Sequence, residues 1–302
     1  MNLLERLFKV KYCIAKKDTD LLELFNRLTC SLDIRNIFNP GFYCSKEVRI
    51  LAFRAIPAGS DRLTSYVVVE DSTGQSIKNI SAEFSEELNV PRLIDPKITQ
   101  LNGEFYITFN SGYVPGGNDI FIMRIYPEIG SPRRLIYRNR QKQERNWAFF
   151  SERGNIYALY RINPLTVLKL ENITSSTWEM GDGVCKDKVN KNLPRDLSLG
   201  TQPFRKNGKF YFMAHKKLYL FRKKIYLGKC CGFDYENMEI EPGKYWWIHS
   251  LKSLLGSKVK HNTNLQSCTY FSGIQISGDM ISLGYGVNDV ECGFSTHNYA
   301  DL

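Results

Sequence analysis

The chain has 302 residues, of which 43% are hydrophobic, 13% aromatic and 24% charged. This composition can bury a sizeable core, which excludes an intrinsically disordered chain, and no apolar run reaches the length of a membrane-spanning helix. The formal net charge of +10 indicates an anionic partner or a basic surface, and no nucleic-acid-binding motif accompanies the basic residues.

Residues 1–36 are predicted to form an N-terminal helical extension, because apolar residues recur at helical spacing behind a capping residue. The cap is Asp18 or Thr19, and the apolar face consists of Leu21, Leu22, Leu24, Phe25 and Leu28. We expect this face to pack against the rest of the fold. The alternative is peripheral contact with a membrane surface, since the same segment carries Arg6, Lys9, Lys11, Lys16 and Lys17.

A hairpin pattern recurs in the remaining chain: a polar turn, then apolar residues alternating about an aromatic position. The five hairpins start at residues 45, 102, 153, 207 and 277, so successive starts lie 57, 51, 54 and 70 residues apart. Propeller blades of four strands repeat roughly every 40 to 50 residues. Residues 37–302 are therefore predicted to form an all-β domain, a five-bladed β-propeller. A β-sandwich with chance similarity among its hairpins is the alternative.

Between the hairpins, the sequence predicts further strands and loops in chain order. Additional strands are expected at residues 64–70, 120–125 and 165–170. The polar stretch 174–198 is predicted to be a loop, and residues 242–264 are predicted to be an insertion that explains the longest spacing.

The last hairpin, residues 277–296, places a carboxylate between two strands. Asn288 and Asp289 suit a turn because their short polar side chains bond to nearby backbone. Asp289 is thus expected on a rim, either as a solvated turn residue or as a functional one.

Polar residues also occur where each blade begins. They are Asn39, Asp95, Arg145 with Asn146, Thr201 with Gln202, and Ser272. In a propeller the innermost strands surround one axis, so residues at the same phase of successive blades face a common central funnel. These polar residues are therefore predicted to converge there.

The cysteines and histidines give no sign of a disulfide framework or a metal site. The eight cysteines include no C-x-x-C pair, and no signal peptide is recognisable in residues 1–10, so reduced thiols in a cytoplasmic protein are expected. The four histidines are dispersed, which predicts metal-independent chemistry. No phosphate-binding or dinucleotide-binding glycine motif occurs, and no cofactor is expected.

Several of these segments together resemble the five-bladed propeller enzymes of glycoside hydrolase family 130, mostly β-mannoside phosphorylases with some hydrolases. The resemblance covers residues 38–296 and rests on five segments in the family's order. They are Asn39-Pro40-Gly41 with Leu51–Ala55, Ile94–Ile98, Glu144–Trp147, Gly200–Pro203 with His215, and Tyr285–Asp289. Two departures from the family's pattern are Ile94, where an acidic residue is usual, and Lys97, where arginine is usual.

The resemblance implies roles for particular residues. Asp95 would be the general acid, and Arg54, Arg145 and His215 would surround the phosphate. Substrate-binding positions would be Asn39, Asn146, Gln202, Tyr285 and Asp289, with Tyr285 and Trp147 able to stack on a sugar or to pack in the core.

The function expected from the resemblance is glycosyl transfer to or from phosphate or an acceptor sugar. A related propeller family uses nucleotide-sugar donors, so a nucleotide-sugar-dependent glycosyltransferase of surface-polysaccharide biosynthesis is one alternative, and a non-catalytic glycan-binding propeller is another. The basic clusters at 133–145, 186–191 and 216–224 are each either a solvated face or part of a site for phosphate or a nucleotide-sugar. The oligomeric state is left open.

Overall fold

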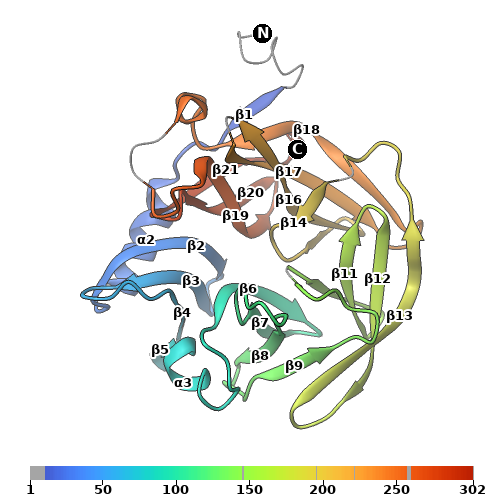
Figure 1. Ribbon diagram of the computed structural model, residues 1–302, viewed down its shortest axis with the longest axis horizontal. Helices are drawn as coiled ribbons and strands as arrows, with labels where there is room; N and C mark the ends of the chain where they lie inside the picture. The colour runs from blue at the N-terminus through green and yellow to red at the C-terminus, as the bar shows by residue number, and fades with distance from the viewer. Residues whose placement is uncertain (1–10, 145, 195, 221, 257–259, 302) are drawn as a thin grey trace.

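The computed structural model describes residues 11–301 except 145, 195, 221 and 257–259. Its strands form five antiparallel units arranged radially about a central axis (Figure 1). The first unit contains β2 (Ile34–Cys44), β3 (Arg49–Pro57), β4 (Thr64–Asp71) and β5 (Gly74–Asn79). The second contains β6 (Ile94–Leu101), β7 (Glu104–Asn110), β8 (Ile120–Tyr126) and β9 (Arg133–Ile136).

The later units are also antiparallel, with four, five and three strands in the described residues. The third contains β10 (Ala148–Glu152), β11 (Asn155–Ile162), β12 (Leu165–Ile173) and β13 (Thr177–Lys188). The fourth contains β14 (Leu197–Leu199), β15 (Phe204–Lys206), β16 (Lys209–Leu220), β17 (Lys223–Asp234) and β18 (Glu239–Ile248). The fifth contains β19 (Leu265–Ser277), β20 (Met280–Val287) and β21 (Glu291–Asn298). The fold is therefore the predicted five-bladed β-propeller.

The predicted hairpins join the first two long strands of each blade. Three of them turn through Asn102-Gly103, Arg153-Gly154 and Asn207-Gly208, where both residues of each pair have positive φ. Two consecutive positive-φ residues form the tight turn whose twist matches that of the flanking strands. The turn chemistry thus explains why the repeat is visible in the sequence.

Aliphatic and aromatic side chains fill the space between successive blades. Separate buried clusters lie between blades one and two, two and three, three and four, and four and five. The cluster that closes the ring contains Phe42 and Phe53 of blade one and Phe294 of blade five. Parallel pairing of β9 with β13, and of β17 with β19, also links neighbouring blades.

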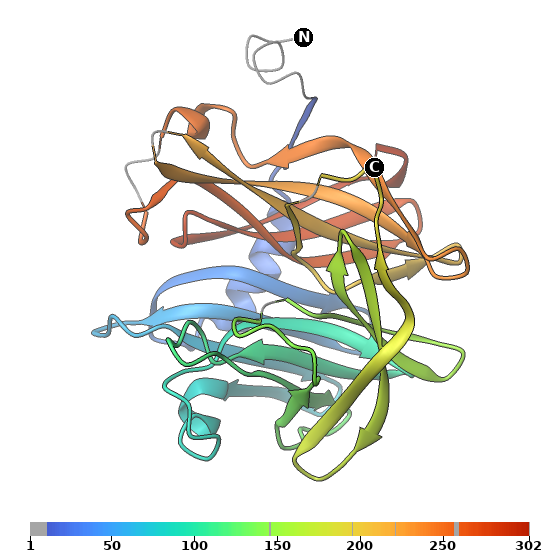
Figure 2. The same cartoon turned by 45° about the vertical axis from the view of Figure 1, so that its right-hand side comes forward.

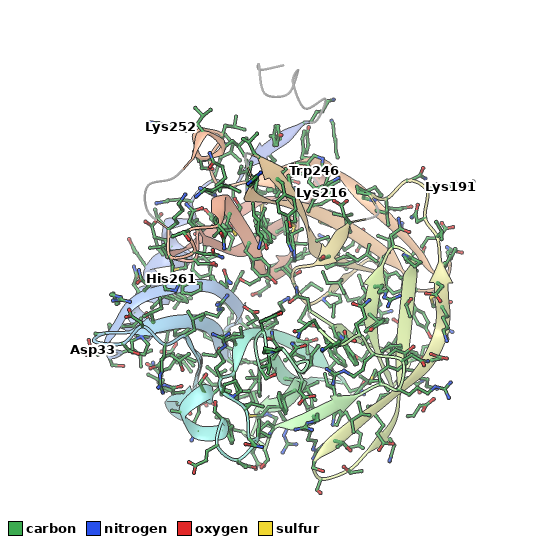
Figure 3. The ribbon with its side chains drawn as sticks, viewed as in Figure 1. Asp33, Lys191, Lys216, Trp246, Lys252 and His261 are labelled. Carbon is green, nitrogen blue, oxygen red and sulfur yellow. The ribbon has the colours of Figure 1, made fainter. Side chains whose placement is uncertain are left out.

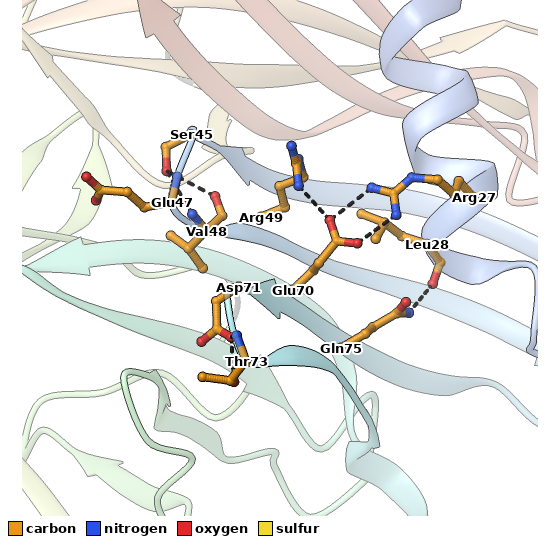
Figure 4. Close-up of polar contacts among 10 residues, drawn as sticks. All are labelled: Arg27, Leu28, Ser45, Glu47, Val48, Arg49, Glu70, Asp71, Thr73 and Gln75. Atoms are coloured by element: carbon orange, nitrogen blue, oxygen red, sulfur yellow. Dashed lines mark hydrogen bonds and ion pairs between the residues drawn. The ribbon is translucent and has the colours of Figure 1, made fainter.

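Helix α2 (Thr19–Thr29) covers the junction of the first and last blades (Figure 2). The side chain of Asp18 caps it by accepting a hydrogen bond from Leu21 N, and Phe25 and Leu28 are buried in the closing cluster. Arg27 pairs with Glu70, which also pairs with Arg49, and Gln75 Nε2 donates to Leu28 O (Figure 4). The helix therefore packs against the propeller, with its cap at one of the two predicted positions.

The segment before the helix is not wholly helical. β1 (Tyr12–Ile14) pairs in parallel with β18, and Lys17 bridges to Ser295 of β21. The first blade begins at Ile34, three residues before the predicted start of the β domain. Residues 1–10, which carry Arg6 and Lys9 of the predicted basic extension, lie outside the described residues.

The predicted loop at 174–198 is wrong, because these residues contain β13, a 12-residue strand. The predicted insertion, residues 242–264, begins with the second half of β18, so only the part after Ile248 lies outside the blade strands. β13 and β18 are both outer strands with one solvent-facing side, so they need fewer apolar residues than the inner strands. The other helices are short: α3 (Ile80–Phe84) and the 3-10 helices η1 (Lys252–Leu255) and η2 (Tyr299–Asp301). Among the described residues, no helix is long and apolar enough to cross a membrane.

Candidate active site

A polar residue in the left-handed region stands in the first strand of blades one and two and just before the first strand of blade three. These are Asn39, Asp95 and Asn146, with φ of 54°, 58° and 58°. Asn and Asp tolerate this conformation better than other residues with side chains. The strand register shifts between Phe38 and Gly41 and between Ile94 and Lys97. Such bulges re-aim side chains, and all three polar side chains line one cavity at the centre of the propeller.

This cavity, the central funnel, has a volume of about 620 Å³. Six of the predicted site residues line it together: Asn39, Arg54, Asp95, Asn146, His215 and Asp289. Arg145, predicted to bind phosphate, lies outside the described residues. The blades therefore bring together residues separated by up to 250 positions in the sequence. This is expected if equivalent positions of successive blades face the same axis.

The carboxylate of Asp95 is held by two neighbours. Arg54 Nη1 lies 3.1 Å from Asp95 Oδ1, and Asn110 Nδ2 donates to Asp95 Oδ2 at 3.3 Å. The Arg54 guanidinium lies over the Phe38 ring, 4.8 Å from its centroid. Arg54 Nε is buried and has no hydrogen-bond partner among the residues that the structure describes. Arg54 thus lines the funnel while it fixes Asp95 in place.

Lys97 is two residues after Asp95 on β6. Nothing in the sequence predicted it at the site, apart from its standing where the resembling family has arginine. Its side chain is buried, and Nζ donates to Asn146 Oδ1 at 2.7 Å. Tyr270 OH donates to the same oxygen at 3.2 Å. Burial lowers the pKa of Lys97 to about 7, against the opposing effect of the Asp95 carboxylate. Two donors therefore fix the oxygen of Asn146, which leaves its amide nitrogen to face the funnel.

Asp289 is placed by the turn at the end of β20. Asn288 and Asp289 both have positive φ, and Asn288 is anchored by exchanging hydrogen bonds with the backbone of Cys268. Burial raises the pKa of Asp289; Arg54 opposes this rise and the negative charge of Asp95 adds to it. Arg54 therefore acts on both carboxyl groups: it pairs with Asp95 and opposes the rise in the pKa of Asp289.

One wall of the funnel is aromatic and cationic. The His215 ring centroid lies 5.0 Å from that of Tyr270 and 5.7 Å from that of Tyr226. Lys217 Nζ lies 5.6 Å from the Tyr226 centroid. Aromatic faces suit the apolar side of a sugar ring, and the cations suit phosphate or carboxylate groups.

Two predicted substrate-binding residues lie away from the funnel. The Gln202 amide is buried: Oε1 accepts from Phe149 N, and Nε2 donates to Thr108 Oγ1 and to Trp147 O. Tyr285 packs between blades four and five, 5.5 Å from Phe271, with its hydroxyl donating to Ala15 O at 3.4 Å. Gln202 thus joins neighbouring blades and Tyr285 fills a core, and neither side chain lines the funnel.

The predicted convergence also fails in the last two blades, where Thr201 and Ser272 do not line the funnel. Thr201 Oγ1 accepts from Met213 N, and Ser272 Oγ donates to Pro40 O, so both hydroxyls serve the backbone. Trp147 is buried as well and donates to Glu144 Oε2. The fifth blade instead contributes Tyr270, two residues earlier on β19.

Other funnel residues were not predicted individually as site residues, although Glu144 stood in one of the resembling segments and Lys217 in a basic cluster. They are Arg92, Asn110, Tyr113, Glu144, Arg161, Lys217, Tyr226, Asn262 and Cys268. Lys217 and Tyr226 could have been predicted from the sequence. Lys217 is two residues after His215, so it lies on the same face of β16, and Tyr226 pairs with Lys217 across the hairpin. Asn110 and Asn262 stand at strand ends or in loops, where polar residues are common in any sequence.

Comparison with known proteins identifies the fold. No protein-family profile matches the sequence, and no curated protein matches it. Solved structures do match: a protein from Parabacteroides distasonis described as a putative glycoside hydrolase has a TM-score of 0.62 at 11% identity, over 89% of this chain and 87% of that one. A structure from work on glycoside hydrolases of family 130 that target β-1,2-mannosidic linkages in Candida mannan has a TM-score of 0.61 at 14% identity, over 87% and 84%.

A third similar structure is the β-1,2-mannobiose phosphorylase from Listeria innocua, in complex with β-1,2-mannobiose. Its TM-score is 0.56 at 12% identity, over 89% of this chain and 91% of that one. At these identities the similarity concerns the fold, and it extends over nearly the whole of each chain. The chain therefore has the five-bladed β-propeller fold of the family 130 mannoside phosphorylases and the related glycoside hydrolases.

Proposed function

We propose that this chain is a carbohydrate-active enzyme that transfers a glycosyl group to or from phosphate or an acceptor sugar in the central funnel. The observation that carries the proposal is the Asp95 carboxylate, held by Arg54 and Asn110 in a polar cavity of about 620 Å³. The propeller fold shared with phosphorylases and hydrolases supports it, although a fold alone does not decide a reaction.

Asp95 would transfer the proton. An arginine 3.1 Å away favours the ionised carboxylate, which is the form of Asp95 that can accept a proton from an acceptor hydroxyl in synthesis. That oxygen would attack the anomeric carbon, and phosphate would leave with the electron pair of the broken bond. In the reverse direction, Asp95 would return the proton to the glycosidic oxygen while a phosphate oxygen attacks the anomeric carbon from the opposite face.

Arg54 would connect the two halves of this reaction. A phosphate bound to Arg54 competes with Asp95 for the guanidinium, which weakens the ion pair and favours protonation of Asp95 when an acid is needed. His215 and Lys217 supply further donors from the fourth blade. Asn39, Asn146 and Asp289 would bind sugar hydroxyls from the remaining sides.

A nucleotide-sugar-dependent transferase is the second candidate. It is favoured by the number of cations along the funnel, since Arg92, Arg161 and Lys217 line it in addition to Arg54. One phosphate needs fewer partners than this, whereas a diphosphate engages several. In this reaction the diphosphate leaves readily without protonation, and Asp95 would serve only as the base.

A donor screen read by mass spectrometry tests the proposal. The protein is incubated with β-1,2-mannobiose and phosphate, then separately with sugar 1-phosphates or nucleotide-sugars and simple acceptors. We expect a sugar 1-phosphate from the first reaction or a lengthened acceptor from one of the others, and loss of product with Asp95→Asn. Saturable glycan binding without product from any donor would instead indicate a glycan-binding propeller.

A further inference from the structure

The hairpin of β16 and β17 extends one wall of the funnel outward. Antiparallel partners point to the same side of a sheet, and the register pairs Lys217 with Tyr226 and Tyr219 with Lys224. His215, Lys217 and Tyr219 alternate along β16, so they share that side as well. We call these five side chains, His215, Lys217, Tyr219, Lys224 and Tyr226, the rim strip.

The rim strip begins inside the funnel and continues beyond it. His215, Lys217 and Tyr226 line the cavity, whereas Tyr219 and Lys224 lie farther along the same face. Same-face positions in a strand are about 6.6 Å apart, so the strip runs about 13 Å from His215 to Tyr219. That length exceeds what a single sugar ring occupies.

The chemistry of the strip alternates rings with cations. Lys217 lies over the Tyr226 ring, and Tyr219 is 65% exposed beside Lys224. Exposed tyrosines offer flat faces for sugar rings, and lysines offer point charges for anionic groups. An exposed aromatic surrounded by cations at the mouth of a polar cavity is therefore suited to an anionic carbohydrate.

The sequence around the rim strip contains no acidic residue. Residues 197–233 and 242–278 contain no aspartate or glutamate. Carboxylates of other blades, Asp95, Glu144 and Asp289, line the funnel. On the opposite face of the hairpin, Lys216 forms an ion pair with Asp196 at 3.2 Å (Figure 3 labels Lys216). The rim strip thus has two lysines and no carboxylate of its own.

We propose that the rim strip binds the part of a glycan substrate that extends out of the funnel, and that this glycan carries phosphate or carboxylate groups. The inference rests on the proposed function, because it assumes that the reacting end of the glycan lies in the funnel. What it adds is the class of substrate, an anionic glycan. Lysine binds phosphate and carboxylate groups through the same charge interaction, so the experiment includes one phosphorylated and one carboxylated oligosaccharide.

The experiment is isothermal titration calorimetry with three probes: neutral mannotetraose, mannotetraose with a terminal 6-phosphate, and tetragalacturonate. For the wild-type protein we expect at least one anionic probe to bind about tenfold more tightly than the neutral one, which corresponds to about 1.4 kcal/mol. This preference should shrink at high ionic strength, since screening weakens exposed charges. The arm that shows the preference identifies the anionic group.

Matched variants locate the effect. Lys217→Gln with Lys224→Gln should abolish the preference, whereas Lys216→Gln, which removes one charge from the opposite face, should retain it. Tyr219→Ala should weaken binding of both charged and neutral tetrasaccharides by a few-fold, because it removes an exposed ring. Thermal unfolding of each variant checks that the fold persists.

Three results would overturn the inference: equal affinity for neutral and anionic probes, a preference that survives loss of both lysines, or binding to phosphatidylserine vesicles without binding to either anionic oligosaccharide. Asp95→Asn separates this inference from the proposed function. If the protein prefers anionic probes but shows no transfer activity, the rim strip stands as a binding site and the proposed function fails. If the protein is active but prefers neutral glycans, the proposed function stands and the inference about the rim strip fails.

Discussion

Replacing Lys97 with methionine should reveal a buried charge through the pH dependence of stability. Lys97 lies on β6 with 2% of its surface exposed, and burial lowers its pKa from 10.5 to about 7. Below pH 7 the lysine is protonated in both the folded and the unfolded chain, and the folded state bears the full cost of burying the charge. Above pH 7 the folded chain releases the proton while the unfolded chain keeps it until about pH 10.5.

The sign and size of the effect follow from proton linkage. Between these two pKa values the unfolded state binds more protons, so the free energy of unfolding of the wild type rises with pH. Each pH unit contributes about 1.4 kcal/mol once the folded-state lysine is fully deprotonated. At pH 7 it is only half deprotonated, so the rise from pH 7 to pH 9 is about 2.3 kcal/mol. Lys97→Met removes the titrating group but also the donor to Asn146. The difference in stability between variant and wild type should therefore move by about 2.3 kcal/mol in favour of the wild type.

Urea unfolding followed by tryptophan fluorescence at pH 6, 7, 8 and 9 measures this difference. Comparing the two proteins at each pH cancels the titration of the tyrosines and cysteines that they share. Lys46→Met, in the exposed turn of the first hairpin, is the matched control and should show a constant difference. A constant difference for Lys97→Met as well would refute the argument that burial opposes the charge of Lys97.

The remaining predictions concern the funnel. Asp289→Asn should weaken sugar binding by roughly 1.5 to 3 kcal/mol, the value of a hydrogen bond to a charged group, with the Kd measured by calorimetry. Arg54→Gln should raise the KM for phosphate, because it removes the guanidinium held against Asp95; an unchanged phosphate dependence would remove Arg54 from the anion site. Gly286→Ala should lower activity without touching any reacting group, since the added methyl would meet Asn39 Oδ1; a crystal structure of this variant with Asn39 unmoved would contradict this.

The inner hairpins were predictable because they are the most buried and most regular parts of the chain. Turns such as Asn102-Gly103 and Asn207-Gly208 force positive φ at both residues, and that requirement leaves a mark in the sequence. The outer strand β13 left no such mark, since its second half is largely exposed and polar. β18 contains Pro242 and Gly243 next to an irregular register with β17, so it resembles a loop in sequence.

The candidate site was predictable where the backbone itself requires particular residues. Asn39 and Asp95 occupy left-handed positions at register shifts, and Asn146 occupies one just before β10, so sequence position and side-chain direction are linked. In blades four and five, however, Gln202 and Tyr285 satisfy buried backbone groups and core packing, which depend on neighbours far away in sequence. Three-dimensional contacts of that kind cannot be read from the spacing of motifs.

Lys97 is the converse case: the sequence did not predict it as a site residue, but in the structure it contacts one. As a single substitution of lysine for arginine it looked like a departure that weakened the resemblance, yet its Nζ lies 2.7 Å from Asn146 Oδ1 and fixes that amide in the funnel. The difference is one of geometry, because a compact ammonium fits beneath Asn146 and Tyr270 where a planar guanidinium presents a wider group of donors.

The central claim is that Asp95 transfers the proton during glycosyl transfer, and Asp95→Asn tests it most directly. The amide keeps the shape and can still accept from Asn110, but it cannot exchange the proton. With the donor that the screen identifies, we expect substrate affinity to change little and turnover to fall by about two to four orders of magnitude, the usual range for general acid–base catalysis. Turnover within a few-fold of the wild type would contradict the claim and leave only the shared fold.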